Sequence, residues 1–204
     1  MRAVIIGNGT VRSYEKIKKY IKADDFIICA DGGINHAVKM DIKPDILIGD
    51  FDSSNPELVF EDVGRIEYPA RKDFTDGELC VKYAAEHGYD EVLLLAMTGT
   101  RADHTLNNML MLSQCEHGMS AEEYNEIYYL KNKIIIENKE GMTLSIIPVK
   151  GNLTGITTKG LEYPLNNEAL YFGESRGNSN VIISDYCEIT VSGGEGLVIL
   201  NNGE

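Results

Sequence analysis

The sequence predicts an α/β protein in two parts: an N-terminal α/β domain with a parallel sheet, followed by a C-terminal all-β antiparallel sandwich. In the first half, short continuous apolar runs alternate with segments of helical spacing, a pattern typical of parallel strands covered on both faces. From about Lys131 onward, strand-like segments follow one another and no convincing helix is found. We therefore expect domains at residues 1–131 and 132–204.

The elements of the first domain follow from the period of its apolar residues. Each apolar run is bounded by turn residues, as expected of a buried parallel strand, and helical segments separate the runs. The expected strands are Arg2–Ile6, Phe26–Ala30, Asp45–Gly49 and Glu91–Met97, and the expected helices are Tyr14–Lys22, Ile34–Met40, Asp76–Glu86 and Ala102–Cys115.

The second domain is expected to contain strands only. Clusters of Gly, Asn and Ser separate its apolar segments, and short strands at this spacing favour an antiparallel sandwich or barrel. The expected strands are Lys133–Glu137, Thr143–Ile147, Leu153–Thr157, Ala169–Phe172, Val181–Ser184, Glu188–Val191 and Leu197–Leu200. No flexible linker marks the boundary, so we expect the two domains to pack directly.

The composition excludes several classes of protein. The chain has 204 residues, 43% hydrophobic and 25% charged, which fits a globular protein with a sizeable core. Its net charge of −13, from 19 Lys plus Arg against 32 Asp plus Glu, disfavours nucleic-acid binding. A phosphorylated small substrate is still compatible, because acidic residues gathered around a divalent metal reverse the local charge.

The sequence also lacks membrane and secretory signals. No apolar run approaches the ~18 residues of a membrane-spanning helix, and the apolar N-terminal run is too short for a signal peptide. The cysteines are widely spaced and include no Cys-x-x-Cys pair, which favours reduced, buried thiols over disulfides or structural zinc. We therefore expect a cytoplasmic protein that binds neither membranes nor nucleic acid.

Two carboxylates follow the third expected strand. Asp50 and Asp52 are spaced i, i+2, so they project to the same side of an extended segment. The carboxyl end of a parallel strand faces the crevice where open α/β sheets bind ligands, and a hard cation such as Mg²⁺ relieves the repulsion between paired carboxylates. The structural alternative is a polar turn in which Ser53 or Ser54 caps a helix.

A second polar segment precedes the helix expected at Asp76–Glu86. Thr75 and Glu78 have the spacing of a capping box, which is a structural role. A helix N-terminus also binds phosphate oxygens. Asp73 and Asp76 are therefore candidate metal ligands, and Lys72 is a candidate phosphate contact.

Further candidates follow the strand ending at Met97. Arg101 lies near the start of the expected helix, where it could bind a phosphate. Asp103, in the first turn of that helix, would stabilise the helix whether or not a ligand binds. His104 has a structural alternative as a hydrogen-bonded histidine. The segment Asp31-Gly32-Gly33 is either a simple turn or a segment whose glycines let a nucleotide approach the backbone closely.

The last candidate segment, Glu174–Asn180, joins two expected strands and is longer than a tight hairpin needs. It is either a plain surface loop or a polar ligand-binding loop.

Taken in order, these motifs resemble those of the thiamine pyrophosphokinase family. They span residues 30–180, and the ordered set is more specific than any single motif. The matching segments are Ala30-Asp31-Gly32-Gly33, Gly49-Asp50-Phe51-Asp52-Ser53, Lys72-Asp73-x-Thr75-Asp76-x-Glu78, Arg101-x-Asp103-His104-Thr105-Leu106-x-Asn108 and Ser179-Asn180. The change from α/β to all-β also looks like that family's two-domain plan.

The resemblance implies transfer of a pyrophosphoryl group from ATP to the hydroxyl of thiamine, leaving AMP. It also implies a homodimer, with thiamine between the α/β domain of one subunit and the β domain of the other. The resemblance implies that Asp50, Asp52 and Asp76 bind Mg²⁺, and that these three residues and Asp73 are catalytic. The residues implied around ATP are Asp31, Gly32, Gly33, Lys72, Arg101, Asp103, His104 and Asn108. The residues implied at thiamine are Ser179 and Asn180. No general base is assigned, although the aspartates are candidates.

Two other functions are kept open. The segment Ile46–Ser53 has a superficial likeness to the aspartyl-nucleophile signature of haloacid-dehalogenase-type phosphatases, in which the first Asp forms a phospho-enzyme. That family explains neither the segment Arg101–Asn108 nor a β domain. A non-catalytic nucleotide or thiamine sensor is the other alternative.

Overall fold

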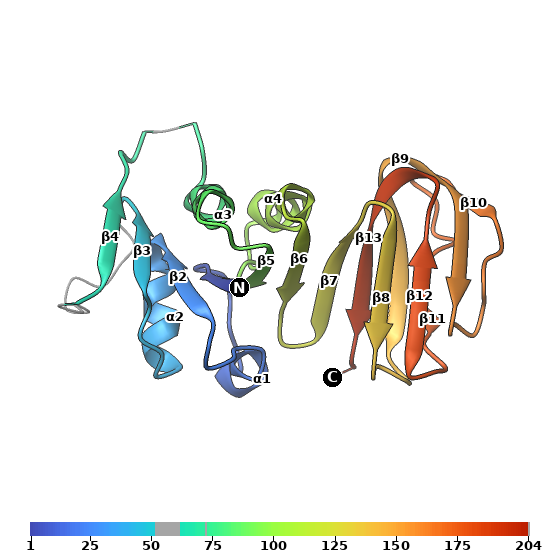
Figure 1. Ribbon diagram of the computed structural model, residues 1–204, viewed down its shortest axis with the longest axis horizontal. Helices are drawn as coiled ribbons and strands as arrows, with labels where there is room; N and C mark the ends of the chain where they lie inside the picture. The colour runs from blue at the N-terminus through green and yellow to red at the C-terminus, as the bar shows by residue number, and fades with distance from the viewer. Residues whose placement is uncertain (52–61, 72, 204) are drawn as a thin grey trace. The chain divides into compact units, whose positions relative to one another are not determined.

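The computed structural model describes residues 1–51, 62–71 and 73–203, and the chain divides into two compact units, Met1–Glu123 and Tyr124–Glu204 (Figure 1). The first unit contains β1 (Arg2–Ile6), α1 (Tyr14–Lys18), β2 (Phe26–Ala30), η1 (Asp31–Gly33), α2 (Ile34–Lys39), β3 (Ile46–Gly49), β4 (Gly64–Glu67), α3 (Asp76–Glu86), β5 (Glu91–Leu95), α4 (Ala102–Met111), η2 (Leu112–Gln114) and β6 (His117–Ala121). The second contains β7 (Asn125–Leu130), β8 (Lys133–Glu137), β9 (Thr143–Lys159), β10 (Glu168–Leu170), β11 (Asn180–Val181), β12 (Tyr186–Thr190) and β13 (Gly193–Asn201).

The first unit is built on a parallel sheet, which confirms the predicted fold class. Its strands lie in the order β4-β3-β2-β1-β5-β6, and every pairing along this path is parallel. The chain first adds strands on one side of β1 and then returns to add β5 and β6 on the other. The order therefore reverses next to β1, and such a switch point is where open α/β sheets form their ligand crevice.

Both faces of this sheet are buried, as the continuous apolar runs predict. Val4 and Ile6 pack in one cluster with residues of α1 and α2. Ala3 and Ile5, which alternate with them along β1, are also fully buried, and α3 packs against β1, β2 and β3. A strand covered on both faces has no polar side, which explains why its sequence does not alternate.

Some elements have little apolar signal and were not predicted. β4 has the sequence Gly-Arg-Ile-Glu and is largely exposed, and β6 has the sequence His-Gly-Met-Ser-Ala. Both are held by parallel pairing, with β3 and β5 respectively. Backbone pairing to a neighbouring strand is a tertiary effect that the local sequence does not report.

The boundary between the units lies between Glu123 and Tyr124, earlier than the expected 131/132. The strand responsible is β7, which pairs antiparallel with β13 along its whole length, from Asn125 opposite Asn201 to Leu130 opposite Gly196. This pairing places residues 125–130 in the second unit.

The second unit is the predicted all-β antiparallel sandwich. β9 pairs with β13, β10 and β11 and, near its C-terminal end, with β12, which in turn pairs with β8. The sequence suggests separate strands at Thr143–Ile147 and Leu153–Thr157, but these form one strand. Gly151 lies between these two segments, and Gly155 lies within the second. Both have positive φ, a backbone conformation that glycine adopts without a steric cost.

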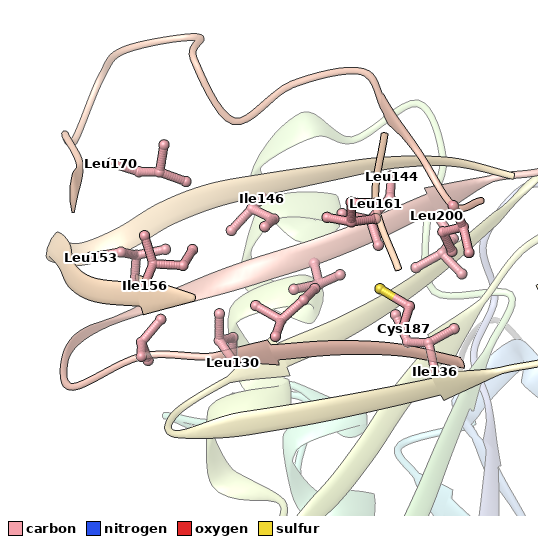
Figure 2. Packing of buried hydrophobic residues seen from close by; sticks show 14 residues of the cluster. Leu130, Ile136, Leu144, Ile146, Leu153, Ile156, Leu161, Leu170, Cys187 and Leu200 are labelled. Atoms are coloured by element: carbon pink, nitrogen blue, oxygen red, sulfur yellow. The ribbon is translucent and has the colours of Figure 1, made fainter. Parts of the chain in front are cut away.

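Side chains from nearly all strands of this unit meet in one apolar interior (Figure 2). They include Leu130 from β7, Ile136 from β8, Ile146 from β9, Cys187 from β12 and Leu200 from β13, all almost fully buried. The thiols of all four cysteines in the chain are free and buried. Within the described residues, no helix has the length and apolar character needed to cross a membrane.

Gly160, at the end of β9, provides a test of this packing. Its φ is +75°, and a Cβ added there would lie 2.2 Å from the carbonyl oxygen of Tyr186. We expect Gly160→Ala to lower the free energy of unfolding by more than about 2 kcal/mol, because a steric clash adds to the cost of ~1 kcal/mol for a left-handed alanine.

The matched control is Gly141→Ala. Gly141 has φ +84°, but nothing lies within 4 Å of its added Cβ. Melting temperatures by circular dichroism compare the two, at about 2–4 °C per kcal/mol for a chain of this size. Equal melting temperatures would show that the contact with Tyr186 is not tight.

Candidate active site

The candidate site lies in the first unit, where the carboxyl ends of the parallel strands meet. Gly7 follows β1, Asp31 follows β2, Asp50 follows β3 and Ala96 follows β5. A cavity of 480 Å³ opens at these strand ends. It is lined by Gly7, Asn8, Ala30, Asp31, Asp50, Ala70, Phe74, Thr75, Asp76, Gly77, Met97, Arg101, His104 and Asn108.

Three carboxylates converge in this cavity. One oxygen each of Asp31, Asp50 and Asp76 lies within 4.8 Å of the others, and all three residues are partly buried. Carboxylate oxygens are the ligands that Mg²⁺ and Ca²⁺ prefer, and a divalent cation would offset the repulsion among three negative charges. The donor set therefore fits a hard divalent metal ion. The sequence placed Asp31 near the nucleotide, whereas the structure brings it into the acidic group.

The other acidic candidates are placed differently. Asp73 is exposed and is absent from the lining of the cavity. Asp52 and Lys72, with Ser53 and Ser54, lie outside the described residues.

The N-terminus of α3 presents Asp76 to the cavity. Thr75 is the N-cap residue, and its hydroxyl oxygen accepts a hydrogen bond from the backbone N–H of Glu78 at 3.2 Å, which is the Thr75 half of the predicted capping box. The Glu78 carboxylate forms an ion pair with Lys82 at 3.1 Å, one helical turn further on. The cap fixes where α3 begins and therefore fixes the position of Asp76, its first residue.

Arg101, which also lines the cavity, forms a bidentate ion pair with Asp103. The Arg101 Nε and Nη2 atoms donate to the two carboxylate oxygens of Asp103 at 2.9 and 2.6 Å. This guanidinium keeps the pKa of the Asp103 carboxyl well below its usual range. Both side chains are largely exposed, so Arg101 is oriented by Asp103 but still faces solvent and the cavity.

A second cavity of 230 Å³ adjoins the first and shares five lining residues with it: Asn8, Met97, Arg101, His104 and Asn108. His104 therefore faces both cavities. Asn108 donates from its side-chain amide to the carbonyl oxygen of Met97 at 2.7 Å. This residue, predicted to contact ATP, also fixes the segment that follows β5.

The glycines of η1 have a packing role. A Cβ at Gly33 would lie 2.0 Å from the carbonyl oxygen of Ile6, and one at Gly32 would lie 2.3 Å from the side-chain nitrogen of Asn8. Both glycines are buried and are absent from the lining of the cavity. Their small size lets η1 approach β1 closely, and this approach holds Asp31 in place.

Ser179 and Asn180 belong to the second unit. The Asn180 amide donates to the carbonyl oxygen of Tyr163 at 2.8 Å and accepts from the N–H of Tyr163 at 3.1 Å. The N–H of Ser179, a residue with φ +58°, donates to the Ser145 hydroxyl at 3.1 Å. Asn180 therefore ties β11 to the Tyr163 segment, a role that the sequence did not indicate.

Sequence reasoning also missed two consecutive glutamates after β6. Glu122 and Glu123 are 7% and 9% exposed. Glu122 accepts a hydrogen bond from the N–H of Met97 at 3.1 Å, and Glu123 accepts from the N–H of Ser13 at 2.7 Å. The only signal in the sequence is a pair of charges directly after a strand, and that strand was not itself predicted.

Comparison with known proteins assigns both halves of the chain to one family. A family model described as "Thiamin pyrophosphokinase, catalytic domain" matches residues 17–122, and one described as "Thiamin pyrophosphokinase, vitamin B1 binding domain" matches residues 131–198. A curated relative, thiamine pyrophosphokinase of Bacillus subtilis (strain 168), is 27% identical over 213 residues, covering 96% of this chain and 95% of the relative. Thiamine pyrophosphokinase 1 of Oryza sativa subsp. japonica is 25% identical, with coverages of 80% and 74%.

Solved structures share the fold. The crystal structure of thiamine pyrophosphokinase from Bacillus subtilis has a TM-score of 0.90 at 24% identity and covers 100% of both chains. The yeast thiamin pyrophosphokinase structure has a TM-score of 0.79 at 16% identity, with coverages of 98% of this chain and 86% of that one. Since the catalytic-domain model alone spans just over half of the sequence, the chain belongs to the thiamine pyrophosphokinase family.

Proposed function

We propose that the chain transfers a pyrophosphoryl group from ATP to the hydroxyl of thiamine, giving thiamine diphosphate and AMP. The observation that carries this proposal is the convergence of Asp31, Asp50 and Asp76 in the cavity at the switch point of the sheet. Family membership supplies the reaction, and the acidic cluster supplies a place for the cation that a triphosphate requires.

The three carboxylates would hold Mg²⁺, and Asp52 is proposed as a further ligand from its position two residues after Asp50. Mg²⁺ bound there would neutralise the charge on the transferring phosphates. Phosphoryl-type transfer depends mainly on alignment and charge neutralisation, so little covalent chemistry is asked of the protein. No described residue is singled out as a general base.

The basic and polar residues that line the cavity are suited to the nucleotide. Arg101, oriented by Asp103, offers a planar fork of donors to phosphate oxygens. His104 and Asn108 lie beside it in both cavities. Lys72 and Asp73 are proposed as additional phosphate and metal contacts from the sequence.

The second unit is proposed to supply the thiamine site, with Ser179 and Asn180 in it, and two copies of the chain are proposed to share each site. For the functional division, residues 1–131 are proposed as the catalytic domain and residues 132–204 as the thiamine-binding domain, although β7 (Asn125–Leu130) belongs to the second compact unit by its pairing with β13. The match of the vitamin B1 binding domain model to residues 131–198 supports this division. The free, buried cysteines suit a reducing compartment, which supports a cytoplasmic location.

The acidic cluster is tested by Asp50→Asn and Asp76→Asn. Each change keeps the side-chain size but removes a charge from a hard-ion ligand. With ATP, Mg²⁺ and thiamine supplied, we expect AMP production to fall on the order of 10²-fold or more, because metal-assisted charge neutralisation contributes several kcal/mol. The melting temperature without ligands should stay equal or rise, since repulsion among the carboxylates is relieved.

The matched control is Asp24→Asn, an exposed aspartate in the same unit, which should leave both activity and melting temperature unchanged. Near-normal AMP production by the Asp50 and Asp76 variants would reject the metal site. If the unchanged protein releases inorganic phosphate instead of AMP, the phosphatase alternative is favoured. If it binds the nucleotide or thiamine without turnover, the sensor alternative is favoured.

The shared site is tested by mixing two inactive variants, Asp50→Asn and the double variant Ser179→Ala/Asn180→Ala. If each site takes the two units from different subunits, hybrid dimers contain one intact site. Random exchange of equal amounts should then restore about a quarter of the normal activity. No recovery, with subunit exchange verified by native mass spectrometry, would reject sharing between subunits.

A further inference from the structure

The segment Ala96–Thr98, which lines the second cavity, is held at every carbonyl group. The carbonyl oxygen of Ala96 accepts from the N–H of Gly9 at 2.7 Å, and that of Thr98 accepts from the N–H of Thr10 at 2.8 Å. The Met97 carbonyl oxygen accepts from the Asn108 amide at 2.7 Å. The conformation of the segment Ala96–Thr98 is therefore set by hydrogen-bond partners outside the segment.

The N–H groups of the same segment converge on one side chain. The N–H of Met97 donates to Oε1 of Glu122 at 3.1 Å, and the N–H and hydroxyl of Thr98 are further donors that act on the same carboxylate and lower its pKa. Ala96, directly before them, has φ +53°. Successive N–H groups beside a left-handed residue form a concave anion-binding site, and here the protein's own carboxylate fills it.

Glu122 is buried at an energetic cost. Burial raises the pKa of its carboxyl to about 7, and the negative charge of Glu123 raises it too, whereas the hydrogen bonds from Met97 and Thr98 act in the opposite direction. The segment Ala96–Thr98 packed against Glu122 has no charged side chain. Protonation thus occurs near neutral pH, and a protonated carboxyl can no longer accept every donor that faces it.

We propose that Glu122 is a positioning residue: its ionised carboxylate holds the Met97–Thr98 segment in the conformation that binds the nucleotide, and protonation releases that segment. This inference rests on the proposed function, because it takes the second cavity as part of the ATP site. Glu122 lines neither cavity and acts only through the backbone of Met97 and Thr98.

The sign of the effect on stability separates this role from a purely structural one. The pKa of Glu122 is raised in the folded state, so the folded protein binds this proton more tightly than the unfolded chain does. The stabilisation that this proton provides is present at low pH and is lost as the pH rises through about 7. Ionised Glu122 therefore destabilises the fold above that pH. Glu122→Gln should melt no lower than the unchanged protein at pH 8, while binding ATP more weakly.

The kinetic experiment measures kcat and the KM for ATP of Glu122→Gln between pH 6 and pH 8. At pH 8 the KM should rise about tenfold, the loss expected for one hydrogen bond to a charged group, with kcat changed less than about twofold. At pH 6 the unchanged protein is itself protonated at this position, so the ratio of the two KM values should fall towards one. The titration of ATP cancels in this ratio.

Two further variants complete the experiment. Glu122→Asp keeps an ionisable carboxylate and should restore part of the affinity at pH 8. Glu123→Gln is the matched control, because Glu123 is as buried and accepts from the backbone of Arg12 and Ser13, which line neither cavity. A KM ratio that does not vary with pH, or an equal rise in Glu123→Gln, would overturn the proposal.

Amide hydrogen exchange on the protein without ATP keeps the inference separate from the proposed function. Protection factors of the Met97 and Thr98 amides should fall between pH 8 and pH 6 in the unchanged protein and be low at both pH values in Glu122→Gln. Equal, pH-independent protection in both proteins would overturn the role of Glu122 even if turnover were observed. Lack of turnover together with the expected exchange pattern would reject the proposed reaction and leave the loop restraint in place.

Discussion

The close approach of the segments after β1 and β5 is the constraint on which the rest of the site depends. The N–H of Gly7 donates to the carbonyl oxygen of Leu95 at 2.9 Å, which continues the pairing of the two strands beyond their ends. A Cβ at Gly9 would lie only 2.2 Å from the carbonyl oxygen of Thr98, so glycine is required there. Because the two segments flank the switch point of the sheet, their contact fixes one wall of both cavities.

The acidic wall depends on a different local device. Asp31 has φ +44°, which is uncommon for a residue with a side chain, and it is followed by two glycines packed tightly against β1 and Asn8. Asp76 is placed by the Thr75 cap at the start of α3. Two different backbone features thus place the Asp31 and Asp76 carboxylates in the same cavity, and both features are positioned by packing against the sheet.

The predictable parts of this protein are those recorded in local sequence. Continuous apolar runs identify β1, β2, β3 and β5 because strands buried on both faces need no polar side. Asp50 was recognised as a candidate because it directly follows such a run. The family resemblance added the order of the motifs, which no periodicity supplies.

The missed features all depend on partners distant in sequence. β4 and β6 form by pairing with strands already in place, and Glu122 acquires its role only when β6 lies beside β5. The hydrogen bonds of the Asn180 amide with the backbone of Tyr163, 17 residues away, likewise cannot be seen in the local sequence. A side chain's type is visible in a sequence, whereas the atoms that occupy its hydrogen-bonding groups are set by the fold.

The strand order of the second unit also constrains how that unit is made. β13, the last of its strands along the chain, lies between β7, the first, and the long β9. Neither sheet pairing of β13 can form until its residues have left the ribosome, although all of the first unit has been synthesised long before. Since domains generally fold in the order of synthesis and distant strand pairings form slowly, the sandwich can close only after β13 has been translated, later than the first unit.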